Sequence, residues 1–147
     1  MSNTLYLDPS ISNFGYCISV DGEIVDYGHK RTYPKYDLHE RVTTIVNLLK
    51  EKIDEYGVDS LVYEYPDKGK YHPTGVQTFI KLGVAIGCVL GMKDWDKVVQ
   101  YTPREWKNNM SKEETSLLIK GKYGIESNDS NEIDSIGLYD FHANNKN

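Results

Sequence analysis

The sequence predicts an α/β fold, in which a mixed five-stranded β-sheet is flanked by helices. Three observations carry this prediction. Segments with strand and helix patterns follow the order βββαβαβααα along the 147 residues, including a short helix at 103–107. Asp21-Gly22, between two apolar runs, is a strong signal for a β-hairpin, which pairs strands antiparallel. A later strand–helix–strand unit requires a crossover, which pairs strands in parallel.

The first half of the chain holds three predicted strands and one long helix. The strands occupy apolar segments at residues 5–8, 14–20 and 23–31. Asp37 and Glu40 form a capping-box pair that begins the helix, and Gly57 is a good residue to end it. Apolar residues at helical spacing fill the interval between these signals.

The second half alternates strands with helices. Strands are predicted at residues 58–64 and 98–101, and helices at about 75–92, 103–107, 111–123 and from 129 onward. Pro103 begins one of these helices at the position where proline is tolerated, and Ser111 caps the next together with Glu114. We expect residues 1–142 to form one domain and residues 143–147 a polar tail.

Composition limits the class of protein. A chain of 147 residues fits one domain, and it has no apolar stretch long enough to span a bilayer and no signal-peptide pattern. Cys17 and Cys88 lie in apolar segments without metal-ligand spacing, so we expect both to be buried hydrophobes in a reducing cytoplasm. The net charge of −5 argues mildly against a nucleic-acid partner, although residues 97–122 hold six basic and three acidic side chains.

Three acidic residues stand where their charge has to be explained. Asp8 and Glu64 each end an apolar strand, and Asp134 lies in the predicted final helix. Burying a charge costs several kcal/mol unless a partner compensates it. Acids from distant parts of a small chain therefore indicate a divalent-metal site, and oxygen ligands without His or Cys favour Mg²⁺ or Mn²⁺.

Five segments carry motifs in a fixed order. They are Leu7-Asp8-Pro9-Ser10 with Gly15-Tyr16, the strand ending in Glu64, Lys81-Leu82-Gly83, Pro103 followed by Lys107, and Asn131-Glu132-Ile133-Asp134. Together they resemble the RuvC family of Holliday-junction resolvases, within the RNase H-like superfamily, over nearly the whole chain. The resemblance implies the RuvC-type RNase H-like fold. Ser10 and Phe14 depart from it, replacing a glycine and a threonine of the family pattern.

The resemblance implies a metal-dependent endonuclease. In this interpretation Asp8 bridges two Mg²⁺ or Mn²⁺ ions, while Glu64 and Asp134 each complete the coordination of one. Two such ions activate a water molecule and stabilise the leaving oxygen of a phosphodiester. The products carry a 5′-phosphate and a 3′-hydroxyl, and Lys107 matches a family lysine close to the scissile phosphate.

Asn131 is the main departure at the expected site. The family usually has Asp there, sometimes His, and residues 131 and 134 share a helical face. An amide oxygen can bind Mg²⁺ but brings no charge, so Glu132 or Asp129 could replace it as the further ligand. The favoured interpretation of Asp129 and Glu132 is a capping box at the start of the final helix.

Further residues are expected to bind the substrate. Lysines and aromatics alternate in the loop after Glu64, where they could hold phosphates and stack on unpaired bases, or could form an ordinary polar loop. The substrate-binding candidates are Lys68, Lys70, Tyr71, Arg104 and Lys112; for Lys112 a solvated helical face is equally plausible. His29, His39 and His142 have no partner pattern and are expected to be structural or exposed.

Gly83, Gly87 and Gly91 share one helical face. That face either packs closely on the sheet or another helix, or helps to form a homodimer, with Phe79, Val84 and Leu90 as interface residues. The family dimerises partly through this region, and a resolvase needs two active sites facing a two-fold symmetric junction.

Three functions remain open. The first is a homodimeric nuclease that resolves four-way junctions or other branched DNA in recombination and repair; the compact size and the divergent motifs suggest a phage version. The second is a junction-binding protein whose site is impaired by Asn131. The third is a YqgF-like RNA-processing nuclease on the same fold. An actin-like ATPase is excluded because 147 residues cannot supply its two lobes and no adenosine motif is visible, so no nucleotide cofactor is expected. No membrane partner is expected either, because no apolar stretch is long enough to span a bilayer.

Overall fold

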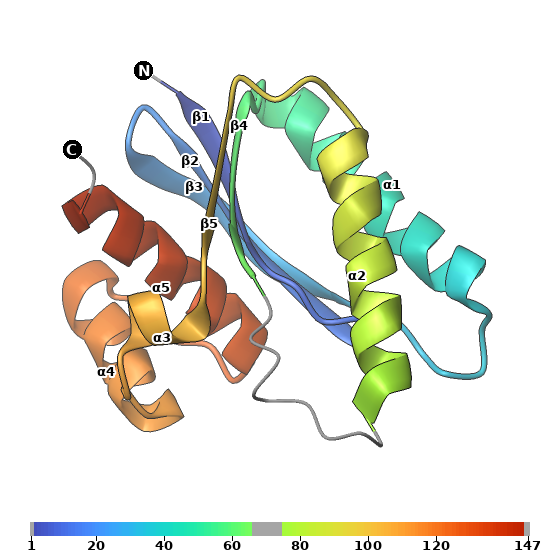
Figure 1. Ribbon diagram of the computed structural model, residues 1–147. Helices are drawn as coiled ribbons and strands as arrows, with labels where there is room; N and C mark the ends of the chain where they lie inside the picture. The colour runs from blue at the N-terminus through green and yellow to red at the C-terminus, as the bar shows by residue number, and fades with distance from the viewer. Residues whose placement is uncertain (1, 66–74, 146–147) are drawn as a thin grey trace.

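The computed structural model describes residues 2–65 and 75–145. The described elements are β1 (Asn3–Asp8), β2 (Asn13–Val20), β3 (Glu23–Arg31), α1 (Leu38–Tyr56), β4 (Ser60–Glu64), α2 (Val76–Gly91), β5 (Lys97–Tyr101), α3 (Pro103–Lys107), α4 (Lys112–Tyr123) and α5 (Ser130–Asn145). Figure 1 shows α1 and α2 on one side of the sheet and α3, α4 and α5 on the other. The predicted order of elements is confirmed.

The five strands form one mixed sheet in the order β3-β2-β1-β4-β5. β2 pairs antiparallel with β1 and β3, whereas β4 pairs in parallel with β1 and β5. The hairpin between β2 and β3 turns at Asp21 and Gly22, whose φ angles of 52° and 83° are typical of a tight hairpin turn. The predicted mixed five-stranded sheet is therefore confirmed.

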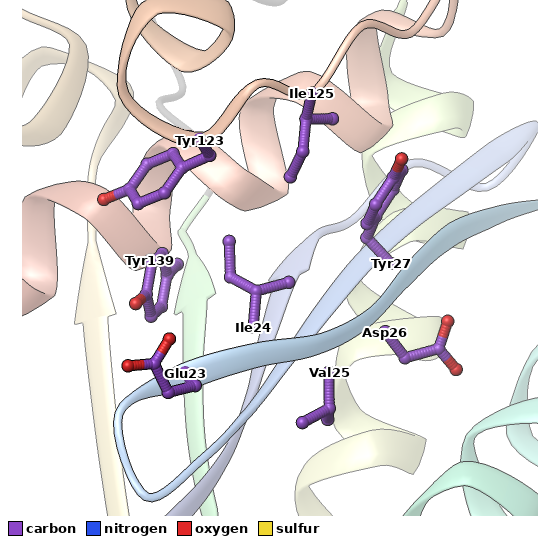
Figure 2. A pocket seen from close by; sticks show the side chains of 8 residues that line it. All are labelled: Glu23, Ile24, Val25, Asp26, Tyr27, Tyr123, Ile125 and Tyr139. Atoms are coloured by element: carbon purple, nitrogen blue, oxygen red, sulfur yellow. The ribbon is translucent and has the colours of Figure 1, made fainter.

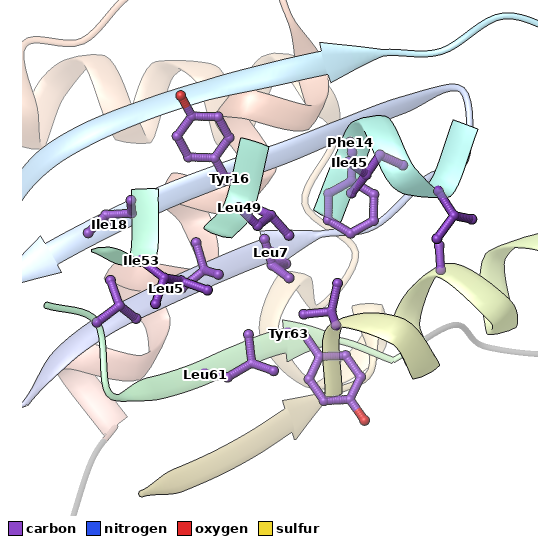
Figure 3. Close-up of a cluster of buried hydrophobic side chains, with 14 of the residues drawn as sticks. Leu5, Leu7, Phe14, Tyr16, Ile18, Ile45, Leu49, Ile53, Leu61 and Tyr63 are labelled. Carbon is purple, nitrogen blue, oxygen red and sulfur yellow. The ribbon is translucent and has the colours of Figure 1, made fainter. Parts of the chain in front are cut away.

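Side chains of β1 alternate between two hydrophobic clusters. Leu5 and Leu7 pack with residues of α1 and α2, whereas Tyr6 packs with residues of α5. Figure 3 shows the first cluster, in which Leu7 lies beside Leu49 and Leu5 beside Ile53, both of α1. This alternation, which is the period of any β-strand, decides which residues of β1 and β4 face α5.

The helix ends follow the predicted chemistry. The Asp37 side chain accepts a 2.8 Å hydrogen bond from the Glu40 amide at the start of α1. Ser111 and Glu114 form a complete capping box at the start of α4. Gly57 and Gly124 end α1 and α4 with φ angles of 60° and 67°, a region that glycine occupies without strain.

Three expectations differ from the structure. α5 continues through Asn145, because Asn144 and Asn145 donate side-chain hydrogen bonds to the carbonyl groups one turn earlier, so residues 143–145 of the expected tail are helical. Cys17 is buried as expected, but Cys88 is exposed. An added Cβ at Gly83, Gly87 or Gly91 would meet no described atom within 4 Å. Within the described chain, the glycine face of α2 therefore packs on neither the sheet nor another helix.

The exposure of Cys88 and of the glycine face has one physical cause. α2 buries a single stripe, Leu82, Ala85 and Val89, and Ala85 and Val89 belong to the cluster between the sheet and α1. Its other side points outward, although it remains apolar. Among the described residues no helix is both long and apolar enough to cross a membrane.

Candidate functional site

A row of residues crosses four strands at the end where β1 and β4 finish. Asp8 pairs with Gly15 on β2, and Gly15 pairs with His29 on β3. Leu7 pairs with Tyr63, so Asp8 and Glu64 are the next residues on two adjacent parallel strands. Strand spacing places such neighbours about 5 Å apart at the backbone.

The two acids of this row face α5. They are two residues after Tyr6 and Val62, both of which belong to the cluster around α5. Asp8 is 9% exposed and Glu64 is 8% exposed. Nearly buried carboxylates at adjacent strand ends are costly for folding unless cations or hydrogen bonds compensate them.

Gly15 lets α5 approach the row closely. A Cβ at this position would lie 2.2 Å from the Asn131 carbonyl oxygen and 2.8 Å from the Asn131 Cβ. Only a hydrogen atom fits there, so the backbone of the first turn of α5 rests on β2 beside Asp8. Asp134 follows one helical turn later and shares a face with Asn131.

A second glycine brings Lys107 to Asp134. The ring of Trp106 occupies the space that a Cβ of Gly137 would fill, with a closest approach of 2.6 Å. This packing seats α3 against α5. Lys107 Nζ then lies 3.2 Å from Asp134 Oδ2 and 3.3 Å from Asp134 Oδ1. The side chains are only 20% and 16% exposed, so the ion pair is partly shielded from water.

The start of α5 tests the capping-box interpretation. Asp129 Oδ1 accepts hydrogen bonds of 3.0 Å from the amides of Asn131 and Glu132, so Asp129 caps the helix as expected. Glu132 does not complete the box, because Ser127 Oγ accepts the hydrogen bond from the Asp129 amide instead. Glu132 turns toward Ser127 and His29.

Asn131 and Asp129 are both held by Asn13 of β2. Asn13 Nδ2 donates to Asp129 Oδ2 at 2.7 Å and to Asn131 Oδ1 at 3.3 Å. Burial raises the pKa of the Asp129 carboxyl, but hydrogen bonds from Asn13 and the helix amides, together with His29, outweigh it and leave the pKa lowered. Asp129 is therefore anionic and oriented by three donors.

His29 is the residue that the sequence did not identify. Its Nδ1 atom contacts Glu132 Oε2 and lies 3.6 Å from Asp129 Oδ2. His29 and Glu132 are 103 positions apart, so no local spacing relates them. The signal that could have found His29 is the strand register, which places it in the row of Asp8.

Of the expected substrate-binding residues, only Lys112 and Arg104 are described by the structure. Lys112 and Asp134 line the same cavity of about 230 Å³ between α4 and α5. Arg104 is exposed on α3. The remaining candidates, Lys68, Lys70 and Tyr71, lie outside the described residues.

A larger cavity, about 420 Å³, contains none of the expected site residues. Figure 2 shows it beside β3, where Tyr123 and Tyr139 face Ile24. Tyr139 donates a 2.6 Å hydrogen bond to the Gly22 carbonyl, and Tyr123 donates one of the same length to Asp140. The Tyr139 hydroxyl thus ties α5 to the hairpin, and the Tyr123 hydroxyl ties α4 to α5.

The residue types of Asp8, Glu64 and Asp134 suit a hard divalent cation, but in the described part of the chain their oxygens do not all lie within 4.8 Å of one another, as the ligand atoms of His29, Asp129 and Glu132 do. Asp8, Glu64 and Asp134 offer carboxylate oxygens only, which are the ligands that Mg²⁺ and Mn²⁺ prefer. Asn131 could add an amide oxygen, but its Oδ1 already accepts a hydrogen bond from Asn13. The chemistry of the donors therefore matches the expected ions.

No family model and no curated protein matches this chain. Several solved structures do match it. Thermus thermophilus RuvC bound to a Holliday junction substrate is 21% identical, with a TM-score of 0.77 over 97% of this chain and 95% of that one. A second Thermus thermophilus RuvC structure is 20% identical, with a TM-score of 0.76 over the same shares of the two chains.

The yeast mitochondrial Holliday junction resolvase is more distant. It is 11% identical, with a TM-score of 0.62 over 97% of this chain and 78% of that one. These similarities, together with the strand order, confirm the predicted fold. The chain has the RNase H-like fold in the form seen in the RuvC resolvases.

Proposed function

We propose that this protein is a metal-dependent, structure-selective endodeoxyribonuclease that resolves Holliday junctions or other branched DNA. The observation that carries the proposal is the placement of Asp8 and Glu64 on adjacent strand ends, nearly buried and facing the helix that carries Asp134. The similar fold of a RuvC bound to a Holliday junction supports this choice of substrate. Such an enzyme would act in the cytoplasm of a bacterial or phage-infected cell.

Asp8, Glu64 and Asp134 would hold Mg²⁺ or Mn²⁺, two ions per site, with the Asn131 amide as a weaker further ligand. When bound, the ions supply an activated water molecule and stabilise the leaving oxygen. Lys107 keeps Asp134 oriented through its ion pair and offers its ammonium group to a phosphate. Lys112 and Arg104 would contact neighbouring phosphates, which strengthens binding without reading sequence.

Two cuts in one junction require two sites, and we place the homodimer contact on α2. Val76, Ile80 and Val84 are 48%, 50% and 40% exposed. They lie beside the glycine face, where another helix could approach closely. The apolar face continues into a groove of about 600 Å³ between α1 and α2. Leu90 is partly buried against the core and therefore offers less surface to a partner than Val84 does.

The dimer contact can be tested with Ile80→Glu. We expect this change to convert the protein to a monomer in sedimentation experiments and to replace paired cuts by single nicks. Leu117→Glu is the control, because Leu117 is 69% exposed on α4 and should leave the mass unchanged. A dimer that survives Ile80→Glu would remove α2 from the interface.

The activity is tested on three substrates of equal length: a four-way DNA junction, linear duplex DNA and duplex RNA. With Mg²⁺ or Mn²⁺ we expect paired nicks in the junction that leave 5′-phosphate and 3′-hydroxyl ends, and no cleavage with EDTA. Asp94→Asn, an exposed residue outside the site, serves as the charge-matched control for Asp8→Asn. Junction cleavage that persists without metal contradicts the proposal.

One observation favours a second candidate, a junction-binding protein that does not cut. Asn131 is neutral, and its oxygen is engaged by Asn13. Tight junction binding without nicking in either metal would support this candidate, and activity gained in Asn131→Asp would identify the missing charge as the cause. Preferential cleavage of RNA by a monomer would instead indicate an RNA-processing nuclease.

A further inference from the structure

A cluster of three potential metal ligands lies two strands away from Asp8. His29 comes from β3, and Asp129 and Glu132 come from the start of α5. The ligand atoms of the three residues all lie within 4.8 Å of one another. The proposed nuclease function does not use these residues.

The spacing of the atoms suits one small cation. Nitrogen and oxygen ligands bound at about 2.0–2.1 Å to a tetrahedral zinc ion are about 3.4 Å apart. His29 Nδ1 and Asp129 Oδ2 are 3.6 Å apart, and His29 Nδ1 also contacts Glu132 Oε2. A small rotation of the exposed His29 ring would therefore open room for a cation between these atoms.

Each carboxylate keeps one oxygen for His29 and has the other oxygen fixed by the protein. Asp129 Oδ1 is held by the amides of Asn131 and Glu132, and Glu132 Oε1 accepts a 2.9 Å hydrogen bond from Ser127. Asp129 Oδ2, the oxygen nearest His29, also accepts a 2.7 Å hydrogen bond from Asn13, and a carboxylate oxygen keeps a second lone pair for an ion. Such outer contacts orient metal ligands and add to metal affinity.

We propose that His29, Asp129 and Glu132 bind a divalent transition metal, Zn²⁺ in preference to Mg²⁺, at a site separate from Asp8, Glu64 and Asp134. An imidazole nitrogen is a poor ligand for Mg²⁺ and a good one for Zn²⁺. Two carboxylates neutralise the ion, and a water molecule completes four-coordination. The bound ion ties the start of α5 to the edge strand β3.

Arg31 is the competing cation. Its Nη2 atom lies 3.8 Å from Asp129 Oδ2, but the side chain is 59% exposed and can move into solvent. A metal ion bound to Asp129 would therefore replace the weak, exposed ion pair between Asp129 and Arg31. Arg31→Ala should strengthen Zn²⁺ binding, whereas the same change would weaken a cluster that serves only as a salt bridge.

The test is calorimetric titration of Zn²⁺ in an Asp8→Asn, Glu64→Gln background, in excess Mg²⁺. This background cannot cut by the proposed mechanism, so the result does not depend on whether the nuclease proposal is correct. We expect one Zn²⁺ per chain and a rise in Tm of roughly 9 °C at 100-fold excess over the dissociation constant. His29→Ala and Glu132→Gln should each weaken binding about a hundredfold.

One further variant tests the third ligand, and another serves as the control. Asp129→Asn keeps a residue type that caps helices but removes the charged ligand, so loss of Zn²⁺ binding with an unchanged circular dichroism spectrum supports the site. His39→Ala removes an exposed histidine of α1 and should leave Zn²⁺ binding unchanged.

Three results would overturn the proposal. They are the absence of Zn²⁺ binding in the background protein, undiminished binding in His29→Ala, and an anomalous zinc peak in crystals that lies away from His29. The crystal experiment uses the unaltered cluster, so it decides the question even if one of the variants fails to fold.

Discussion

The two faces of the sheet use the same strands for different purposes. On the face toward α1 and α2, Leu5 and Leu7 belong to an apolar cluster. On the face toward α5, Tyr6 is apolar in the middle of β1, and Asp8 follows it at the strand end. β4 repeats this arrangement with Val62 and Glu64.

This difference teaches how a small domain can hold buried charge. The α1–α2 face supplies continuous apolar burial, which compensates for the desolvation of acids on the opposite face. Asp8 and Glu64 stand at the strand ends, on the side of the sheet that α5 covers. Adjacent residues on one strand should therefore separate stability from activity, and the following changes test that separation.

The largest effect is expected from Asp8→Asn. Cleavage of a four-way junction should fall on the order of 10³-fold, because the carboxylate proposed to hold both ions is lost. Junction binding should be unchanged or tighter, since phosphate contacts remain and repulsion decreases. Gel-shift and cleavage assays on one preparation measure both, and wild-type cutting rates in this variant would exclude Asp8 from catalysis.

Leu7→Ala should show the opposite pattern. Leu7 is 2% exposed, so its removal should lower the free energy of unfolding by about 3 kcal/mol. Cleavage per folded molecule should stay near wild type. Urea denaturation measures the loss, and Leu117→Ala on the surface should cause almost none.

Gly15→Ala tests how α5 is seated. Because the new methyl group would overlap the Asn131 backbone, we expect a loss of stability of about 2 kcal/mol together with reduced cleavage. Denaturation and cleavage measured in parallel would show both changes. An alanine without effect on either would mean that α5 does not depend on this contact.

Lys107→Ala should cost less than the glycine change. It leaves the partly buried Asp134 without its lysine and removes a proposed phosphate contact, so cleavage or junction binding should fall about tenfold. Titration of junction DNA at two salt concentrations, with turnover measured separately, assigns the effect. If both quantities stay at wild-type values, Lys107 does not belong to the site.

Gly121→Ala should produce the smallest change and in the opposite direction. Gly121 lies within α4, and an added Cβ would meet no described atom within 4 Å. Alanine should therefore raise the free energy of unfolding by about 0.5–1 kcal/mol. Thermal unfolding of this variant beside Gly15→Ala would compare one glycine required by packing with one that is not.

Local patterns explain why much of the fold could be predicted. Alternation, the Asp21-Gly22 turn and the caps at Asp37 and Ser111 each act within a few residues, and all of them are present in the structure. The crossover rule predicts parallel pairing, which β4 shows, but the rule does not say that β4 lies next to β1; the resemblance to the RuvC family implies that neighbourhood of Asp8 and Glu64. Whether these acids act as catalytic metal ligands stays a prediction.

The contacts that depend on packing between distant elements could not be predicted. Gly15 and Gly137 are informative only once α5 is known to lie on β2 and α3 on α5. His29 meets Glu132 only through the strand register. Cys88 lies in an apolar run that reads as buried, but α2 has one packed side and one open side.

A helix anchored at one end unravels from the other. Asp129, Asn13 and the close fit at Gly15 hold the first turn of α5, whereas residues 143–145 are exposed. Amide hydrogens near Asp134 should thus exchange with solvent far more slowly than those of the last turn. Thermal fraying is in this way directed away from the carboxylates, so the domain can loosen at its margin without disturbing their alignment.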